Sequence, residues 1–440
     1  MTTTIEKPIE SSAGDAAVQR NETRGFKRLL RSLGPGLITG ASDDDPSGIG
    51  TYAVAGSSLG YSTLWTALVS LPMMTVVQYT CAKIGMVSGT GLAAVLRERF
   101  PRPLVYTAVF ALVMANTINA GADIGAIAAA INLLLPIPNT LLIVPVGGAI
   151  LALQIWGSYK VIVSCFKWLT LALLAYIGSA LFAHPNWSDV LRGTFVPQIS
   201  FEAGYVSTLV AIFGTTISPY MFFWQPSEEV EEKIARGMVT LEQRRGATGS
   251  ELIAARWDTR IGMFFSNLIM YFIILATGAT LFQAGQKQIT SAAQAAEALR
   301  PLAGDAAALL LAVGLIGSGL LAVPVLTGSS AYAVADTWGW TSGLSQKPRD
   351  ARAFYGVIIA GTAFGMLFNF VGINPIDALF WTAVLNGFLA PPLLVLVMLV
   401  ANDRRIMGGR TNGRWLNVVG WGTTIVMFAA AIGLVATWAH

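Results

Sequence analysis

Three consecutive carboxylates, Asp43, Asp44 and Asp45, stand directly before Pro46 in an apolar stretch over residues 33–57. A charged side chain inside a bilayer costs several kcal/mol unless it is paired or faces water, so acids in such a stretch indicate a functional site. Pro46 lacks a backbone N–H, and carbonyl groups near residues 41–45 should therefore be released from the helix. Carboxylate and carbonyl oxygens are the ligands that a hard divalent cation prefers. Asp43 and Asp44 are expected to raise the local cation concentration or to tie this broken helix to its neighbours.

A second interruption lies in the apolar stretch over residues 203–225, where Gly214, Thr215, Ser218 and Pro219 follow closely on one another. The two interruptions occupy the same place in two successive runs of five apolar segments. Interrupted helices at corresponding positions predict a transporter built from inverted repeats, with its substrate between the breaks. An ordinary proline kink explains one interruption taken singly, but it is a poor explanation of the pair together with the aspartates.

A third polar group lies in the apolar segment over residues 103–132. Asn116, Asn119 and Asp123 follow a spacing that places them on one helix face. This face either lines a wet path for ions or protons or makes hydrogen bonds between helices, and Asp123 is the member for which we favour a functional role. Asn386, in the segment over residues 376–401, is a further candidate for lining a cavity.

The composition identifies the class of protein. The chain has 440 residues, of which 54% are hydrophobic and 12% charged, whereas about 25% are charged in an average soluble domain. The apolar runs are about twenty residues long and apolar on every face, which indicates membrane-spanning helices rather than a β-barrel. With only two Cys and two His residues, a metal cluster built from these side chains is not expected. The basic residues are scattered, so nucleic acid is not an expected partner.

Hydropathy predicts an all-α polytopic membrane protein with eleven spans. These cover residues 33–57, 62–87, 103–132, 139–157, 161–183, 203–225, 258–283, 305–333, 352–373, 376–401 and 415–438. Of the 28 Lys and Arg residues, 25 lie on the side of the N-terminus, which predicts a cytoplasmic N-terminus and an extracytoplasmic C-terminus. The loop over 227–257 is expected to be a solvated connector with a short amphipathic helix.

The expected organisation has four parts. A polar cytoplasmic tail covers residues 1–31, and the transport core covers 32–402. Within the core, the first repeat is expected over 32–183 and the second over 203–402. Residues 403–440 form a loop and the eleventh helix.

At these motifs the chain resembles the Nramp family of divalent metal transporters, over roughly residues 30–400. The resemblance rests on Gly34-Pro35-Gly36 leading to Asp45-Pro46, on Gly214-Thr215 leading to Pro219, and on Asn132-Leu133-Leu134 closing the third span. It implies the amino-acid-transporter type of fold, which is LeuT-like, with two inverted five-helix repeats plus one extra helix. It also implies that the metal ion is cargo and that no resident cofactor is needed.

The chain departs from the family at two signatures. Asp-Pro-Gly-Asn in the first span is Asp45-Pro46-Ser47-Gly48 here, so the acid is kept and the amide is lost. Met-Pro-His in the sixth span is Ser218-Pro219-Tyr220 here, so the thioether and the imidazole are both absent.

The resemblance implies a metal site made by Asp45, the carbonyls of Ser42 and Thr215, and the positions of Gly48 and Ser218. Without sulfur, the remaining oxygen ligands suit Mg²⁺ and Mn²⁺. The small residues also predict a roomier pocket that holds a partly hydrated ion, because Mg²⁺ gives up water reluctantly. The pattern is similar to the Nramp-related magnesium transporters.

We expect a secondary transporter of the inner membrane that moves Mg²⁺ or Mn²⁺ by alternating access. The family's proton route uses a histidine where this chain has Tyr220, and of its third-span acids only Asp123 aligns, so protons stay open as a coupling ion. One alternative is a conventional proton-coupled Mn²⁺/Fe²⁺ Nramp transporter. A second is a Na⁺-coupled carrier of a small organic solute, although the aspartates would repel a carboxylate. A third, an intramembrane protease using Asp45 and Asp123, lacks the expected Gly-x-Gly-Asp motif.

Overall fold

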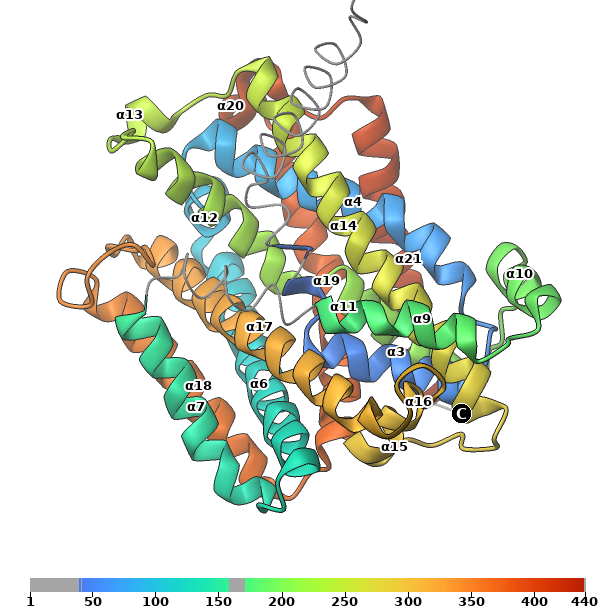
Figure 1. Cartoon of the computed structure of the whole chain (residues 1–440). Coiled ribbons are helices and arrows are strands. Elements are labelled where there is room, and N and C mark those ends of the chain that lie inside the picture. Colours follow the sequence, from blue (N-terminus) through green and yellow to red (C-terminus); the bar gives the residue numbers. More distant parts are fainter. Residues whose placement is uncertain (1–38, 41, 158–170, 439–440) are drawn as a thin grey trace, which may run out of the picture. The chain divides into compact units, whose positions relative to one another are not determined.

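The computed structural model describes residues 39–40, 42–157 and 171–438, which belong to one compact unit. Within these residues every regular element is a helix (Figure 1). The Gly34-Pro35-Gly36 motif, most of the basic tail, Lys160, Cys165 and His440 lie outside the described residues. The predicted all-helical class is therefore confirmed for the part that the structure describes.

Nine helices in the described ranges are long and apolar enough to cross a membrane. Eight of them contain the continuous elements α4 (Trp65–Ser88), α6 (Arg102–Leu134), α7 (Asn139–Trp156), α14 (Gly249–Thr277), α17 (Ala307–Trp338), α18 (Arg352–Phe368), α19 (Pro375–Asn402) and α21 (Arg414–Trp438). The ninth consists of α11 (Ala203–Thr216) and α12 (Pro219–Ala235), which meet at the second predicted interruption. Most bounds agree with the hydropathy prediction to within a few residues.

The remaining two predicted spans are described only in part. The first contains helical residues up to Asp43, an interruption at Asp44 and Asp45, and then α3 (Pro46–Leu59). The fifth is described from Leu171 onward, as the 3₁₀ turn η1 (Leu171–Leu174) and α9 (Ala175–Phe182). Shorter helices connect the spans: α5 (Leu92–Arg99), α10 (Trp187–Phe195), α13 (Leu241–Arg244), α15 (Ala292–Glu297), α16 (Arg300–Ala303) and α20 (Arg404–Met407).

The predicted loop over 227–257 is wrong in its extent. Helix α12 continues to Ala235, and α14 already begins at Gly249, where Thr248 and Glu251 form a capping box. Glu228 and Glu229 are buried instead of solvated. The Lys233 ammonium holds this region together, because it donates to the carbonyls of Met86, Arg244 and Gly246 at 2.6–2.7 Å. The charges therefore lie on a packed helix, and only residues 236–248 connect the two spans.

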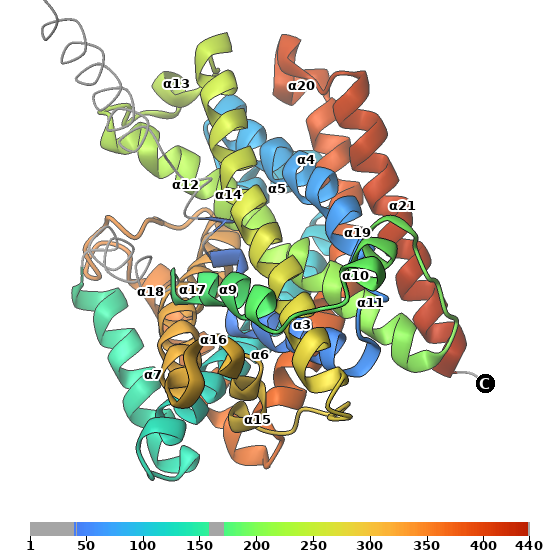
Figure 2. The ribbon, with the colours of Figure 1, turned by 45° about the vertical axis from the view of Figure 1, so that its right-hand side comes forward.

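Two sets of helices flank the broken ones. Helices α6, α7, α17 and α18 lie together, and α4, α14 and α21 lie on the other side in both views (Figure 1, Figure 2). Helix α3 packs against α14 and α19, and α11 packs against α19. Glycine permits the closest of these contacts, since a Cβ on Gly214 would lie 2.0 Å from the carbonyl oxygen of Ala383. The two interruptions therefore lie inside the helical bundle, between these two sets of helices.

Candidate metal site

Each interruption has a proline four residues after a key carbonyl. An α-helical carbonyl accepts a hydrogen bond from the N–H four residues later. Pro46 cannot donate to the Ser42 carbonyl, and Pro219 cannot donate to the Thr215 carbonyl. The local sequence therefore releases the two backbone oxygens that the family resemblance implies as ligands.

Asp45 lies at the first break and caps helix α3. Its Oδ1 accepts from the backbone N–H of Gly48 and from the hydroxyl of Ser47, both at 2.7 Å, and its Oδ2 accepts from Asn119 Nδ2 at 3.3 Å. Only 1% of Asp45 is exposed. An ionised carboxylate offers about four lone-pair sites, so these three bonds leave capacity for one cation contact.

Tyr220 joins the two breaks. Its hydroxyl donates to the Ser42 carbonyl at 3.0 Å, and its own backbone carbonyl accepts from the hydroxyl of Ser329 at 2.6 Å. Tyr220 is fully buried. A tyrosine at the family's histidine position therefore fixes the position of a predicted ligand carbonyl across 178 residues of sequence.

The Ser218 hydroxyl contacts the backbone carbonyls of the preceding turn at the second break. It donates to the carbonyl of Thr215 at 2.6 Å and approaches that of Gly214 at 3.3 Å. The Thr215 carbonyl has a second lone pair, which remains available to a cation. Ser218 thus contacts the predicted ligand carbonyl of Thr215, and its own oxygen stays a predicted ligand.

The predicted extra room at Gly48 is not present in this structure. A Cβ at Gly48 would lie 3.1 Å from Thr215 Oγ1 and 3.4 Å from both the Asp43 carbonyl and Asp45 Oδ1. Contacts of 3.0–3.4 Å are tighter than most real Cβ contacts. Helix α11 closes on Gly48, which explains why removal of a side chain here produces close approach instead of a cavity.

Asp43 and Asp44 lie against helix α14. Ser266 Oγ lies 2.6 Å from Asp43 Oδ2 and 3.2 Å from Asp44 Oδ1, and all three residues are buried. One hydroxyl carries one proton, so it donates to one carboxylate at a time. This contact connects the first break to helix α14. The role of the two aspartates stays a prediction.

The polar residues on one face of α6 make two different kinds of contact. Asn116 donates to the Leu326 carbonyl at 3.2 Å and to Ser330 Oγ at 3.0 Å, which are hydrogen bonds between helices. Asn119 instead reaches Asp45. Both carboxylate oxygens of Asp123 are buried without a hydrogen-bond partner among the described residues. Asn386 on α19 is also buried, and its Nδ2 has no partner in the described part of the chain.

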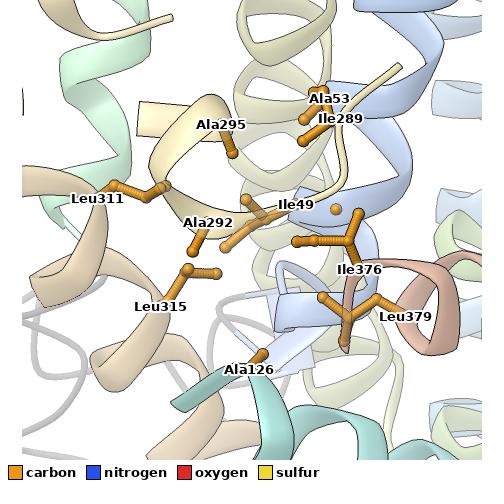
Figure 3. Close-up of a pocket in the computed structure, with 11 residues that line it drawn as sticks. Ile49, Ala53, Ala126, Ile289, Ala292, Ala295, Leu311, Leu315, Ile376 and Leu379 are labelled. Atoms are coloured by element: carbon orange, nitrogen blue, oxygen red, sulfur yellow. The ribbon is translucent and has the colours of Figure 1, made fainter. Parts of the chain in front are cut away.

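Apolar side chains from α3, α6, α15, α17 and α19, here called the apolar collar, close one side of the site. A cavity of about 20 Å³ lies between α3, α6, α15, α17 and α19, and its lining residues are apolar throughout (Figure 3). Ile49 enters it from α3, one turn after Asp45. Leu311, Leu315 and Leu379 face it from the other helices. A bare cation cannot cross such a region cheaply, so the site is shut toward α15.

A polar chain leads away from the site in the other direction. Thr39 donates to Gln225 Oε1, and Gln225 Nε2 donates to Glu229 Oε1 at 3.0 Å. These residues, together with Ser266, are absent from the predicted site. Ser266-Asn267 inside an apolar span, and Gln225 beside Pro226, are signals that would have found part of this set.

Comparison with known proteins decides the family. A model described as "Natural resistance-associated macrophage protein-like" matches residues 36–437. The chain belongs to the Nramp family. It is therefore a multi-pass membrane protein and a divalent metal cation transporter of that family, not an enzyme.

Two curated relatives match this Nramp chain over nearly their whole length. The divalent metal cation transporter MntH of Deinococcus radiodurans is 27% identical over 433 residues, which cover 96% of this chain and 94% of the relative. The transporter of the same name from Bacillus subtilis is 27% identical over 441 residues, which cover 98% and 97%.

Solved structures confirm the LeuT-like fold of this Nramp chain. A crystal structure of the Eremococcus coleocola manganese transporter matches with a TM-score of 0.70 at 20% identity, covering 99% of this chain and 90% of that one. Mhp1, a nucleobase-cation-symport-1 family transporter in a closed conformation, matches with a TM-score of 0.56 at 14% identity, covering 92% and 93%.

Proposed function

We propose that this Nramp protein transports Mn²⁺ and accepts Mg²⁺ as a second substrate, by alternating access between the two proline breaks. The observation that carries the proposal is the donor set: one carboxylate, two carbonyls that proline excludes from helical bonding, and one hydroxyl, from Asp45, Ser42, Thr215 and Ser218. All are oxygen donors, which both ions accept in octahedral coordination.

Mn²⁺ has the stronger support as the physiological ion. Relatives that match over nearly the whole chain are named MntH, and the Eremococcus coleocola neighbour is a manganese transporter. The case for Mg²⁺ rests on the replacement of the family's methionine and asparagine by Ser218 and Gly48. Since Gly48 adds no room, we infer that Mg²⁺ enters because no soft ligand rejects it, and assignment to a magnesium branch is not needed.

The two sides of the site support alternating access. The apolar collar shuts the side toward α15, whereas Thr39, Gln225 and Glu229 offer polar atoms toward the other side. With 25 of 28 basic residues on the side of the N-terminus, we propose that the collar faces the extracytoplasmic space and the polar chain faces the cytoplasm. The protein would then lie in the cell membrane with its N-terminus inside.

Coupling to protons is not obligatory in this proposal. The Tyr220 hydroxyl donates its proton to the Ser42 carbonyl, and a phenol oxygen is a much weaker base than an imidazole nitrogen, so Tyr220 does not replace a histidine as a proton acceptor. Asp123, whose two carboxylate oxygens have no hydrogen-bond partner among the described residues, remains the group on α6 through which any coupled proton would pass.

Uptake into proteoliposomes tests the proposal. Mn²⁺ entry is followed with a dye inside the vesicles, together with internal pH, and Mg²⁺ is added as competitor. We expect Asp45→Ala to abolish Mn²⁺ entry while Asp350→Ala, at an exposed loop residue, leaves it unchanged. Half-inhibition by Mg²⁺ should occur within about a hundredfold of the Mn²⁺ concentration, which corresponds to about 2.7 kcal/mol of discrimination. Mn²⁺ entry that is not inhibited by a larger excess of Mg²⁺ would show that this oxygen site selects Mn²⁺ over Mg²⁺.

A further inference from the structure

The structure holds a groove on its membrane-facing surface that is separate from the transport site. It has a volume of about 510 Å³ and lies between α4, α14 and the start of α21. Its residues are Leu71, Pro72, Thr75, Val76, Trp257, Arg260, Ile261, Phe264, Phe265 and Trp415. Pro72 lies inside α4, where it removes one helical hydrogen bond. We propose that this groove binds one anionic phospholipid.

One end of the groove is basic and aromatic. The Arg260 guanidinium lies 5.2 Å from the centre of the Trp257 ring, and Trp257 and Trp415 are 58% and 69% exposed. Tryptophan side chains of this kind collect at the level of the lipid headgroups. This end of the groove therefore lies where a phosphate group would be.

Further basic residues lie on the helices next to that end, although they do not line the groove itself. Arg256 stacks over Tyr79 at 5.6 Å, one helical turn before Arg260 on the same side of α14. Arg256 and Arg410 both lie close enough to Lys83 to repel its ammonium. Among the ion pairs formed by described residues, none includes Arg256, Arg260 or Arg410. This excess of positive charge is complementary to a phosphodiester, and basic pockets between spans at the cytoplasmic surface bind lipid headgroups.

The other end of the groove is apolar. Ile261, Phe264 and Phe265 continue along α14 from Arg260, and Leu71 and Val76 line the groove from α4. Phe264 and Phe265 are 50% and 47% exposed, so about half of each side chain is left uncovered. An acyl chain running inward from a phosphate at Arg260 would fill this recess. One molecule with an anionic head and an apolar tail matches both ends.

Lipid titration of the purified full-length chain in detergent, read by native mass spectrometry, tests the inference. The probes are phosphatidylglycerol and phosphatidylcholine, which carry similar acyl chains but differ in net charge. We expect wild type to bind phosphatidylglycerol more tightly. Arg260→Gln should weaken that binding about fivefold, and Arg256→Gln with Arg260→Gln about 25-fold, with little change for phosphatidylcholine.

Two further variants separate the groove from general surface charge. Arg352→Gln, at an exposed arginine at the start of α18, should leave both lipids unaffected. Thr75→Trp fills the groove and should weaken both lipids, because it displaces the acyl chain. Equal binding of both lipids by wild type, or equal losses in Arg352→Gln and Arg260→Gln, would overturn the proposal. A dimer that dissociates in Thr75→Trp would also overturn it, since a second copy would then be the occupant.

Discussion

The two proline breaks differ most at equivalent positions, the residue directly before each proline. Asp45 uses its carboxylate to cap the following helix, accepting from Gly48 N–H at 2.7 Å. Ser218 makes no such cap and turns back to donate to the Thr215 carbonyl at 2.6 Å. The first break thus contributes a negative charge, and the second contributes neutral oxygens.

This asymmetry would determine how a cation is held in the proposed site. No group of three or more His, Cys, Asp or Glu side chains able to hold a metal occurs within the described ranges. In the proposed site, the Asp45 carboxylate would supply the negative charge and backbone carbonyls would complete the coordination shell. Half-helix carboxyl ends and unwound carbonyls are the usual cation ligands at such breaks. Substitutions at the first break should therefore affect transport more than those at the second.

The largest effect is expected at Asp45. Asp45→Asn keeps an oxygen that can cap α3 but removes the charge, so we expect Mn²⁺ uptake to fall at least about a hundredfold while the free energy of unfolding changes by less than about 1 kcal/mol. Asp45→Ala should lose uptake as well as about 1 kcal/mol of capping energy. Uptake assays and thermal unfolding of both variants separate the two roles. Substantial uptake by Asp45→Asn would show that capping, not charge, is the role of this residue.

A change of metal preference is expected at Ser218. Ser218→Met places a thioether at the second break, so Cd²⁺ should inhibit Mn²⁺ uptake about tenfold more strongly than in wild type, and Mg²⁺ should inhibit less. Ser218→Leu is the matched control, because it has similar bulk without sulfur. If the leucine variant shows the same gain in Cd²⁺ inhibition, bulk and not ligand softness sets the preference.

The smallest effect is expected at the bond that joins the breaks. Tyr220→Phe removes the donor to the Ser42 carbonyl, which should lower the free energy of unfolding by about 1 kcal/mol and raise KM for Mn²⁺ about threefold to tenfold. Ser329→Ala removes a hydrogen bond to the Tyr220 backbone without touching Ser42. It should reduce stability similarly and leave KM unchanged. Matching KM values in the two variants would argue against a positioning role for the Tyr220 hydroxyl.

Most of the helices could be predicted from the sequence, because spans need about twenty apolar residues and this requirement is local. The extent of α12 could not, since Glu228, Glu229 and Lys233 look solvated in sequence. Lys233 is buried because carbonyls from α4 and from the 236–248 connection accept from its ammonium. The buried Glu229 accepts from Gln225 Nε2. Hydrogen bonds to residues far apart in the sequence can therefore allow a charged segment to be buried inside the protein.

The residues of the candidate site could be proposed from the sequence, but their contacts could not be predicted. Pro46 and Pro219 identify the released carbonyls by a fixed spacing of four residues, and Asp45 is conspicuous as an acid in an apolar segment. The contact of Ser266 with Asp43 and the bond from Tyr220 to Ser42 span more than 170 residues each. The room expected at Gly48 was wrong for the same reason, because the approach of Thr215 depends on how α11 packs.

An anomalous difference map from crystals soaked in Mn²⁺ tests the central claim most directly. We expect one peak between the Asp45 carboxylate and the Thr215 carbonyl, at oxygen distances of about 2.0–2.3 Å, with no peak in crystals of Asp45→Ala. A peak between Asp43, Asp44 and Ser266 that persists in Asp45→Ala would contradict the account and move the metal site to the contact with α14.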